Sequence, residues 1–398
     1  MNNAKFNCRA SDRSESLTAI GVERMGDLAD TLTNPQLLRL ENLDTDILPP
    51  AEALDVSAKA VYQDDANSYL PFFGHNVFRQ AATELVTRLT GLPSNTYDWR
   101  KQCFFSAGGC NGVLNVLLAC INPGDEVVLT SPTYVGLINR VKLAGGIPKF
   151  IPLLPEKQGW RLDIAAIDRV VSAKTRAFLL TSPSMPTGAV LNKTEWEAVV
   201  KACLATDAWM IYDAAMERLL FDNIAHIHPA SLANMAERTI TVGAASKEYR
   251  MIGWRVGWVV CPLTIAEAIG RVSISNVVCP VGIAQQAVAA AIQSQNDGII
   301  AATQEWQTRR DVLLTELQDF NIIKPQGGWS LLIDVSSLGY SGKEASKRLL
   351  ENANIAVTSM ENWGAAGVEK YIRLVYSNES CMRLEGIGER MRKALAVD

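Results

Sequence analysis

A lysine and an arginine stand eight residues apart in the segment SKEYRMIGWRVGW, and both side chains could take part in chemistry. Lys247 ends a run of the β-strand type, where its amine would be partly desolvated. Desolvation lowers the pKa of an ammonium group and so favours a neutral amine, which can form a Schiff base with an aldehyde. Arg255 offers a planar guanidinium that suits a phosphate. A lysine taken alone is more often a solvated surface residue, so a catalytic role for Lys247 can be inferred only together with the residues around it.

Two further segments favour the binding of an anion. In SAGGCNGVLNVL, small residues precede a predicted helix, whose first N–H groups and dipole attract negative charge. Gly109, Cys110 and Asn111 lie at that point, and an ordinary glycine-rich turn is the alternative interpretation. Arg373 lies in the middle of the apolar segment YIRLVYSNE. An arginine there is costly unless it is paired, so this position also invites an anion.

The elements that must position these residues alternate between short apolar runs and helical stretches. The runs predicted as strands begin at Glu126, Ala177, Trp209, Thr239 and Gly257. Helices are predicted from Thr194, with that threonine as the cap, and over residues 111–120. Helical crossovers make most strands parallel, and ligands of such sheets bind beyond the carboxyl ends of the strands. The loops SAGGCN, SPSMPTG, DAAM and SKEYR are expected there.

The last hundred residues differ from the rest of the chain. A charged helix is predicted from Gln304, followed by strands in GGWSLLIDV and YIRLVYSNE. This change predicts a second, smaller domain against which the N-terminal residues pack. We therefore expect an N-terminal segment joining the small domain (1–48), a large domain (49–304) and a C-terminal small domain (305–398).

Composition excludes several classes of protein. The 398 residues are 48% hydrophobic and carry a net charge of −4, which disfavours nonspecific binding to nucleic acid. The cysteines form no CxxC pair and the three histidines have no zinc-like spacing, so no metal site is expected. The two longest uncharged stretches are interrupted by polar residues, and the N-terminus has no apolar signal region. We expect a cytoplasmic protein with reduced thiols that does not span a membrane.

The pattern SKxxxxxGWRxG is made here by Lys247, Gly253, Trp254, Arg255 and Gly257. It resembles the Schiff-base lysine segment of class I/II aminotransferases, the fold type I enzymes that use pyridoxal 5'-phosphate. The resemblance continues as ordered motifs over residues 40–378. It implies an α/β fold, with a large domain built on a mainly parallel, seven-stranded sheet and a smaller α/β domain. It also implies amino-group transfer between an α-amino acid and a 2-oxo acid.

The resemblance implies how the cofactor is bound. Lys247 would be the catalytic residue and would carry the cofactor as a Schiff base. Asp213 would pair with the pyridine nitrogen, with helix capping as the alternative role. The remaining cofactor-binding residues that the resemblance implies are the phosphate loop Gly109, Cys110 and Asn111, the phosphate ligand Arg255, Tyr134 against the pyridine face, and Tyr69. Tyr69 would reach the phosphate of the neighbouring subunit, which implies a homodimer.

Substrate binding is implied for two residues. Arg373 matches the position that binds the substrate α-carboxylate through a bidentate pair. Asn42, with Leu43 beside it, stands where the family usually has a glycine that lets the substrate approach the backbone, so the pocket would be reshaped. Arg271 falls near the position where dicarboxylate-specific members of the family place a second substrate-binding arginine, contributed by the partner subunit. An arginine at such a position more often lies on a helix surface and binds no substrate.

Two positions depart from the family pattern. Met185 replaces the asparagine of the usual NPTG, and Met216 replaces a tyrosine; both of the usual residues bond the phenolic oxygen of the cofactor. Methionine cannot replace either donor, although it can simply pack near the ring. A lyase, cyclase or oxidase acting on an amino acid therefore stands as the alternative to transamination. A catalytically silent protein is disfavoured because Lys247, Asp213, Arg255 and Arg373 are retained together.

Overall fold

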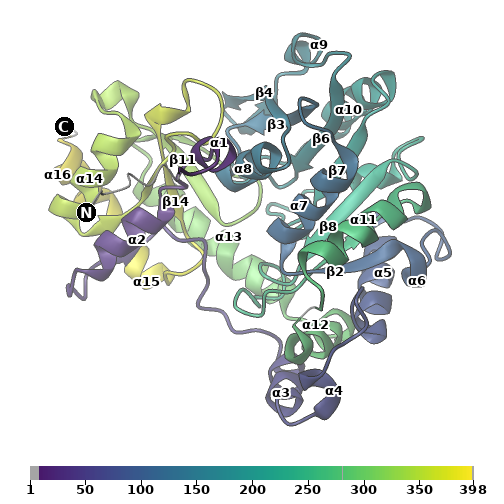
Figure 1. Ribbon diagram of the computed structural model, residues 1–398. Coiled ribbons are helices and arrows are strands. Elements are labelled where there is room, and N and C mark those ends of the chain that lie inside the picture. Colours follow the sequence, from purple (N-terminus) through teal and green to yellow (C-terminus); the bar gives the residue numbers. More distant parts are fainter. Residues whose placement is uncertain (1–8, 280, 397–398) are drawn as a thin grey trace, which may run out of the picture.

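The computed structural model describes residues 9–279 and 281–396 and contains two main sheets, one much larger than the other (Figure 1). The strands of the larger sheet are β2 (Cys103–Ser106), β3 (Glu126–Ser131), β4 (Ile147–Glu156), β5 (Gly159–Leu162), β6 (Thr175–Thr181), β7 (Trp209–Asp213), β8 (Thr239–Ala244) and β9 (Gly257–Val260). They lie in the order β2-β9-β8-β7-β6-β3-β4-β5. All five apolar runs predicted as strands are strands of this sheet.

Most neighbours in the larger sheet are parallel, as predicted. β4, β3, β6, β7 and β8 pair in parallel, whereas β9 runs antiparallel to β8 and β2. The sheet has eight strands, one more than the seven predicted. The reason is that β4 is ten residues long: its first part pairs with β3, and residues 153–156 turn back in a hairpin with β5.

Helices cover both faces of the larger sheet. α7 (Gly109–Cys120), α8 (Val135–Leu143) and α11 (Leu263–Asn276) share one apolar cluster with strand residues such as Leu179 and Ile211. The neighbouring residues Phe178 and Met210 point to the opposite face, where they pack with α10 (Lys193–Ala205). This alternation follows from the two-residue period of a strand. Further along that face, α5 (Asn76–Thr90) and α12 (Gly282–Gln293) form a third cluster.

The cap predicted for α10 is corrected by the structure. Thr194 lies inside the helix, and Asn192 is the N-cap. The Asn192 side chain accepts a hydrogen bond from the Glu195 backbone, and the Glu195 side chain accepts one from the Asn192 backbone. This reciprocal capping box satisfies two helix-terminal N–H groups, which a threonine two residues later, inside the helix, does not do.

The smaller sheet contains β10 (Asn321–Ile323), β11 (Ser330–Asp334), β13 (Thr358–Ser359) and β14 (Tyr371–Val375), in the antiparallel order β10-β11-β14-β13. β11 and β14 are the two strands predicted near the C-terminus. From the other end of the chain, β1 (Leu38–Arg39) pairs in parallel with β12 (Ile355–Ala356). Both chain ends therefore contribute to this part of the molecule, as the purple and yellow segments of Figure 1 show.

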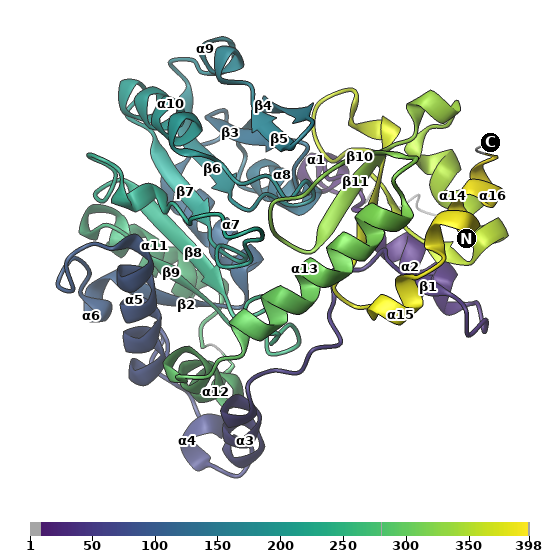
Figure 2. The ribbon, with the colours of Figure 1, turned by 180° about the vertical axis from the view of Figure 1, so that it is seen from behind.

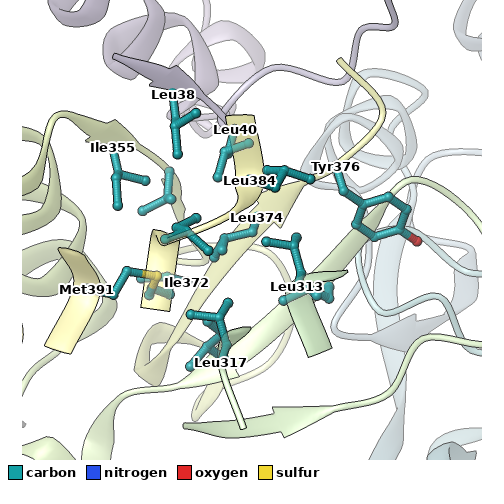
Figure 3. Packing of buried hydrophobic residues seen from close by; sticks show 14 of the residues in the cluster. Leu38, Leu40, Leu313, Leu317, Ile355, Ile372, Leu374, Tyr376, Leu384 and Met391 are labelled. Atoms are coloured by element: carbon teal, nitrogen blue, oxygen red, sulfur yellow. The ribbon is translucent and has the colours of Figure 1, made fainter. Parts of the chain in front are cut away.

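One long helix, α13 (Ile299–Glu316), runs between the two sheets (Figure 2). Its Leu313 packs in a buried cluster with Leu38 of β1 and Leu374 of β14, and Figure 3 shows these side chains meeting. The expected division between residues 304 and 305 falls inside this helix. The other longer helices are α2 (Val22–Asp30), α3 (Ala51–Ala60), α14 (Gly342–Ala353) and α16 (Ile387–Leu395), and the short ones are α1 (Asp12–Glu15), α4 (Asp64–Asn67), α6 (Trp99–Gln102), α9 (Ile167–Val170) and α15 (Cys381–Leu384).

Within residues 9–279 and 281–396, none of the helices combines the length and the apolar character needed to cross a membrane.

Candidate active site

A cavity of about 600 Å³ lies where the two sheets face each other. The last residues of β6, β7 and β8, namely Thr181, Asp213 and Ala244, line it, and Arg373 of β14 closes it from the smaller sheet. The carboxyl ends of parallel strands are the usual place for a ligand in such folds. The volume is within the range of small-molecule and cofactor sites.

Lys247 lies three residues after the end of β8 and lines this cavity. Its Nζ donates a 2.9 Å hydrogen bond to the Leu43 carbonyl and lies 4.9 Å from the centre of the Trp329 ring. Burial disfavours the charged ammonium and lowers the pKa of Lys247 to about 8. About a tenth of the amine is then neutral at pH 7, far more than for an ordinary lysine, and the neutral amine is the nucleophilic form.

Asp213 ends β7 and also lines the cavity. One carboxylate oxygen accepts a 3.2 Å hydrogen bond from the Ala215 backbone, and no ion pair to Asp213 exists within residues 9–279 and 281–396. Burial therefore raises the pKa of Asp213 to about 6. A cation placed beside this carboxylate would reverse that shift, which makes Asp213 a ready partner for a protonated ring nitrogen.

An anion cradle forms where the loop before α7 meets Arg255. Gly108, the N-cap of α7, has a φ of 84° and no side chain to bond the helix N–H groups. A Cβ at Gly108 would lie 2.6 Å from Nη2 of Arg255, so only glycine lets the guanidinium lie this close to the loop. Arg255 bonds only the Ile252 carbonyl, at 2.7 Å, among the described residues. Free helix N–H groups beside an unpaired guanidinium make a phosphate site.

The three residues predicted for the phosphate loop differ in placement. Gly109 and Cys110 line the cavity at the start of α7. Asn111 turns its side chain back to its own loop, where Oδ1 accepts a 3.0 Å hydrogen bond from the Ala107 backbone. Asn111 thus holds the shape of the loop, and its side chain is not part of the cavity wall.

Arg373 is buried, with 1% of its surface exposed, and no carboxylate bonds it within the described part of the chain. Its guanidinium donates to the Glu41 carbonyl, more weakly to Thr358, and to the Met185 sulfur at 3.6 Å. It also lies 4.8 Å from the centre of the Trp363 ring, and its Nε has no partner in the described chain. Burial lowers the pKa of Arg373 to about 10. A carboxylate in the cavity would supply the missing countercharge.

Tyr134, Met185, Met216 and Asn42 all line the same cavity. The ring of Tyr134 lies 5.6 Å from that of Trp363, centre to centre, and burial raises the pKa of the tyrosine. Both methionines occupy the wall where the family has an amide and a phenol. Thioethers offer no proton to an oxygen at that place.

Tyr69 and Arg271 lie away from the cavity of this chain, and for Arg271 a place on a helix surface is the expected outcome. Tyr69 follows α4 and is 84% exposed. Arg271 lies on the surface of α11, where it forms an ion pair with Glu267 one turn earlier. Neither side chain lines the cavity.

The sequence did not identify four residues of the cavity wall, Arg39, Glu41, Ser246 and Trp363, nor Gly108, which lies against Arg255. Arg39 and Glu41 carry a recognisable signal, since they alternate with the buried Leu38 and Leu40 and so place two charges on one face of a strand-like segment. Trp363 follows β13 in an irregular loop, and its spacing gives no such signal.

Comparison with known proteins fits this geometry. Residues 39–385 match the family model described as aminotransferase class I and II. The aromatic-amino-acid aminotransferase 2 of Thermococcus litoralis is 29% identical over 97% of this chain and 98% of its own length. The arginine–pyruvate transaminase of Pseudomonas aeruginosa is 30% identical, with 87% of each chain covered.

Solved structures agree with the sequence comparison. The aspartate aminotransferase of Thermus thermophilus, solved with maleate, has a TM-score of 0.88 at 28% identity and covers 97% of this chain and all of its own. The N-succinyldiaminopimelate aminotransferase of Mycobacterium tuberculosis has a TM-score of 0.89 at 26% identity, with coverage of 97% and 100%. The chain therefore belongs to the class I and II aminotransferase family, and it is a transferase enzyme with the α/β fold of that family.

Proposed function

We propose that this aminotransferase moves the amino group of an α-amino acid to a 2-oxo acid with pyridoxal 5'-phosphate held by Lys247. The observation that carries the proposal is the set of charges facing one cavity without ion-pair partners among the described residues: Lys247, Asp213, Arg255 and Arg373. These groups match the aldehyde, ring nitrogen and phosphate of the cofactor and the carboxylate of the substrate. When bound, the cofactor accepts the electrons left at the substrate α-carbon.

Each residue would then have a defined task. The N-terminus of α7 and Arg255 would hold the phosphate, and Asp213 would keep the ring nitrogen protonated. Arg373 would orient the substrate through its carboxylate. Lys247 Nζ, once displaced by the substrate amine, would carry the proton that leaves the α-carbon, for which a pKa of about 8 is well suited.

We also propose a homodimer in which Tyr69 reaches the neighbouring subunit's phosphate. The high exposure of Tyr69 and its distance from the cavity of its own chain support this role. Mixing Lys247→Ala protein with Tyr69→Phe protein would restore activity, because one site of the mixed dimer would contain both native residues. A monomeric mass for cofactor-loaded protein would overturn the proposal.

The division into segments 1–48, 49–304 and 305–398 and a cytoplasmic location remain proposals too. The pairing of β1 with β12 supports joining the first segment to the last. Cys103, Cys203 and Cys261 are buried and form no disulfide, as is usual for proteins of a reducing compartment.

Met185 and Met216 in the cavity wall favour one alternative, a lyase, cyclase or oxidase that begins with the same proton removal. A single half-reaction separates the two. Cofactor-loaded protein is mixed with pools of amino acids without any oxo acid, and the cofactor and products are identified by absorbance and mass. Pyridoxamine phosphate with an equivalent of oxo acid supports transamination. Consumption of amino acid with recovery of pyridoxal phosphate contradicts it.

A further inference from the structure

One part of the cavity wall carries mainly acidic residues. Its ionisable residues come from α2 and the segment around β1, and they are Glu23, Asp27, Asp30, Arg39 and Glu41. Four carboxylates thus stand against one guanidinium, an excess of three negative charges. We call these five residues the acidic wall. None of them is assigned to the cofactor or to the substrate carboxylate.

The single cation of the acidic wall is already used by its neighbours. Arg39 Nε donates a 2.7 Å hydrogen bond to Oε1 of Glu41, and Nη1 donates a 2.6 Å bond to Oδ1 of Asp30. A second carboxylate on a substrate side chain would find no unpaired cation on this wall. Arg271, the other candidate, pairs with Glu267 outside the cavity.

Glu41 shows that the wall is built for a ligand. The residue is fully buried, and its Oε2 has no hydrogen-bond partner among the described residues. A buried carboxylate oxygen without a partner is costly, so its retention calls for a donor that is supplied from outside the chain. Arg373 cannot be that donor in the present arrangement, because it bonds the Glu41 carbonyl and not the carboxylate.

Glu41 is also in the right place to meet a substrate side chain. Its carbonyl bonds Arg373, and the carbonyl of Leu43, two residues later, bonds Lys247. The segment 41–43 therefore spans the space between the group proposed to hold the substrate carboxylate and the group proposed to move its α-proton.

We propose that the amino donor is an α-amino acid whose side chain ends in a cation, ammonium or guanidinium, which is bound by Glu41 with support from Asp27 of the acidic wall. The inference rests on the proposed function, since it names the substrate class of the same site. Charge-assisted hydrogen bonds to a buried carboxylate are stronger than neutral ones, so a cationic side chain gains most at Glu41.

Matched pairs of amino acids test the proposal on the cofactor-loaded full chain. Arginine is compared with citrulline, its neutral analogue, and lysine with norleucine; glutamate represents the dicarboxylates. The readouts are kcat/KM for oxo acid formation and binding followed by the cofactor absorbance. We expect the cationic member of a pair to be preferred by about tenfold or more.

Two variants locate the effect. Glu41→Gln should lower the ratio of kcat/KM for arginine over citrulline about tenfold. Asp27→Asn, at an exposed position that tolerates substitution, should lower it by about two- to threefold, because exposed charges are screened. Glu197→Gln on α10, exposed and outside the cavity, is the charge-matched control and should leave the ratio unchanged.

The outcomes separate this inference from the proposed function. Transamination of neutral or acidic amino acids with no preference for cationic ones overturns the inference and leaves the function standing. Failure of every cationic amino acid to react or to change the absorbance also overturns it. If Glu41→Gln does not fold, the test proceeds without it. The inference is then overturned when Asp27→Asn leaves the kcat/KM ratio of arginine over citrulline unchanged and the native protein shows no preference for cationic amino acids.

Discussion

The two walls of the cavity differ in how their charges are satisfied. Lys247, Asp213 and Arg255, the residues proposed to hold the cofactor, form one wall, which we call the cofactor wall. None of the three forms an ion pair with the described residues. On the acidic wall, Arg39 is bonded by two carboxylates of its own chain. The first wall is therefore prepared for a ligand that brings several charges. On the second wall the only cation is already paired within the chain, and Oε2 of Glu41 is left without a hydrogen-bond partner among the described residues. A charged side chain that lacks a partner within the chain is therefore a better indicator of ligand binding than a charged side chain as such.

Loss of the lysine on the cofactor wall should have the largest effect. Replacing Lys247 with alanine removes both the attachment of the cofactor and the carrier of the α-proton, so we expect kcat/KM to fall by about 10³-fold or more. Steady-state kinetics on an amino donor measures this change. Lys193→Ala, an exposed lysine at the start of α10, is the matched control. Activity within tenfold of native in Lys247→Ala would contradict the assignment of the cofactor wall.

Two buried arginines provide the next comparison. Arg373 has no carboxylate partner among the described residues, whereas Arg310 is paired with Asp222 at 2.9 Å and with Asp311. Arg373→Gln should lower kcat/KM about 100-fold through a higher KM with little loss of folding stability. Arg310→Gln should instead cost about 3 kcal/mol of unfolding free energy, since it breaks a buried ion pair. Equal loss of stability in both variants would assign Arg373 a structural role.

The unpaired carboxylate should destabilise the protein when the cofactor is absent. Burial raises the pKa of Asp213 from 3.8 to about 6, so the folded state prefers the protonated form. The stability present below pH 4 is lost as the pH rises through 6, and at pH 7 the loss reaches about 2–3 kcal/mol. Asp213→Asn apoprotein should therefore be more stable than native apoprotein at pH 7 and equal to it near pH 4. Urea unfolding at the two pH values measures this, and a destabilised variant at pH 7 would count against an unpaired Asp213.

The smallest effect is expected at Met185. Met185→Asn would place an amide donor where the family usually has one, and a hydrogen bond to the phenolic oxygen supports its negative charge. The pH midpoint of the absorbance change of cofactor-loaded protein should fall by about 0.5–1 unit. Met382→Asn, at an exposed position, is the control. An unchanged midpoint would mean that this oxygen does not lie near Met185.

Much of the cofactor wall could be predicted from the sequence because its residues follow short apolar strands at fixed offsets. Asp213 ends β7, and Lys247 follows β8 by three residues, so the strand pattern already placed both at one edge of the sheet. The hairpin of β5 was missed, since four residues after a long strand give little periodic signal.

The alternation of Arg39 and Glu41 with buried leucines is a local signal, but the place of the acidic wall beside the cavity could not be predicted, because it depends on long-range packing. The Glu41 carbonyl accepts a hydrogen bond from Arg373 of β14, and Trp363 lines the cavity from an irregular loop. No local pattern reports contacts between residues more than 300 positions apart. Asn42 was identified in this region through the family resemblance, whereas its charged neighbour Glu41 was not.

The role of Lys247 in holding the cofactor is tested most directly by locating the cofactor on the chain. Protein loaded with pyridoxal 5'-phosphate is reduced with borohydride and digested, and the peptides are analysed by mass spectrometry. We expect one pyridoxyl group, on Lys247, in the peptide that contains SKEYR. A label on another lysine, or no label at all, would contradict the claim that this cavity holds the cofactor through Lys247.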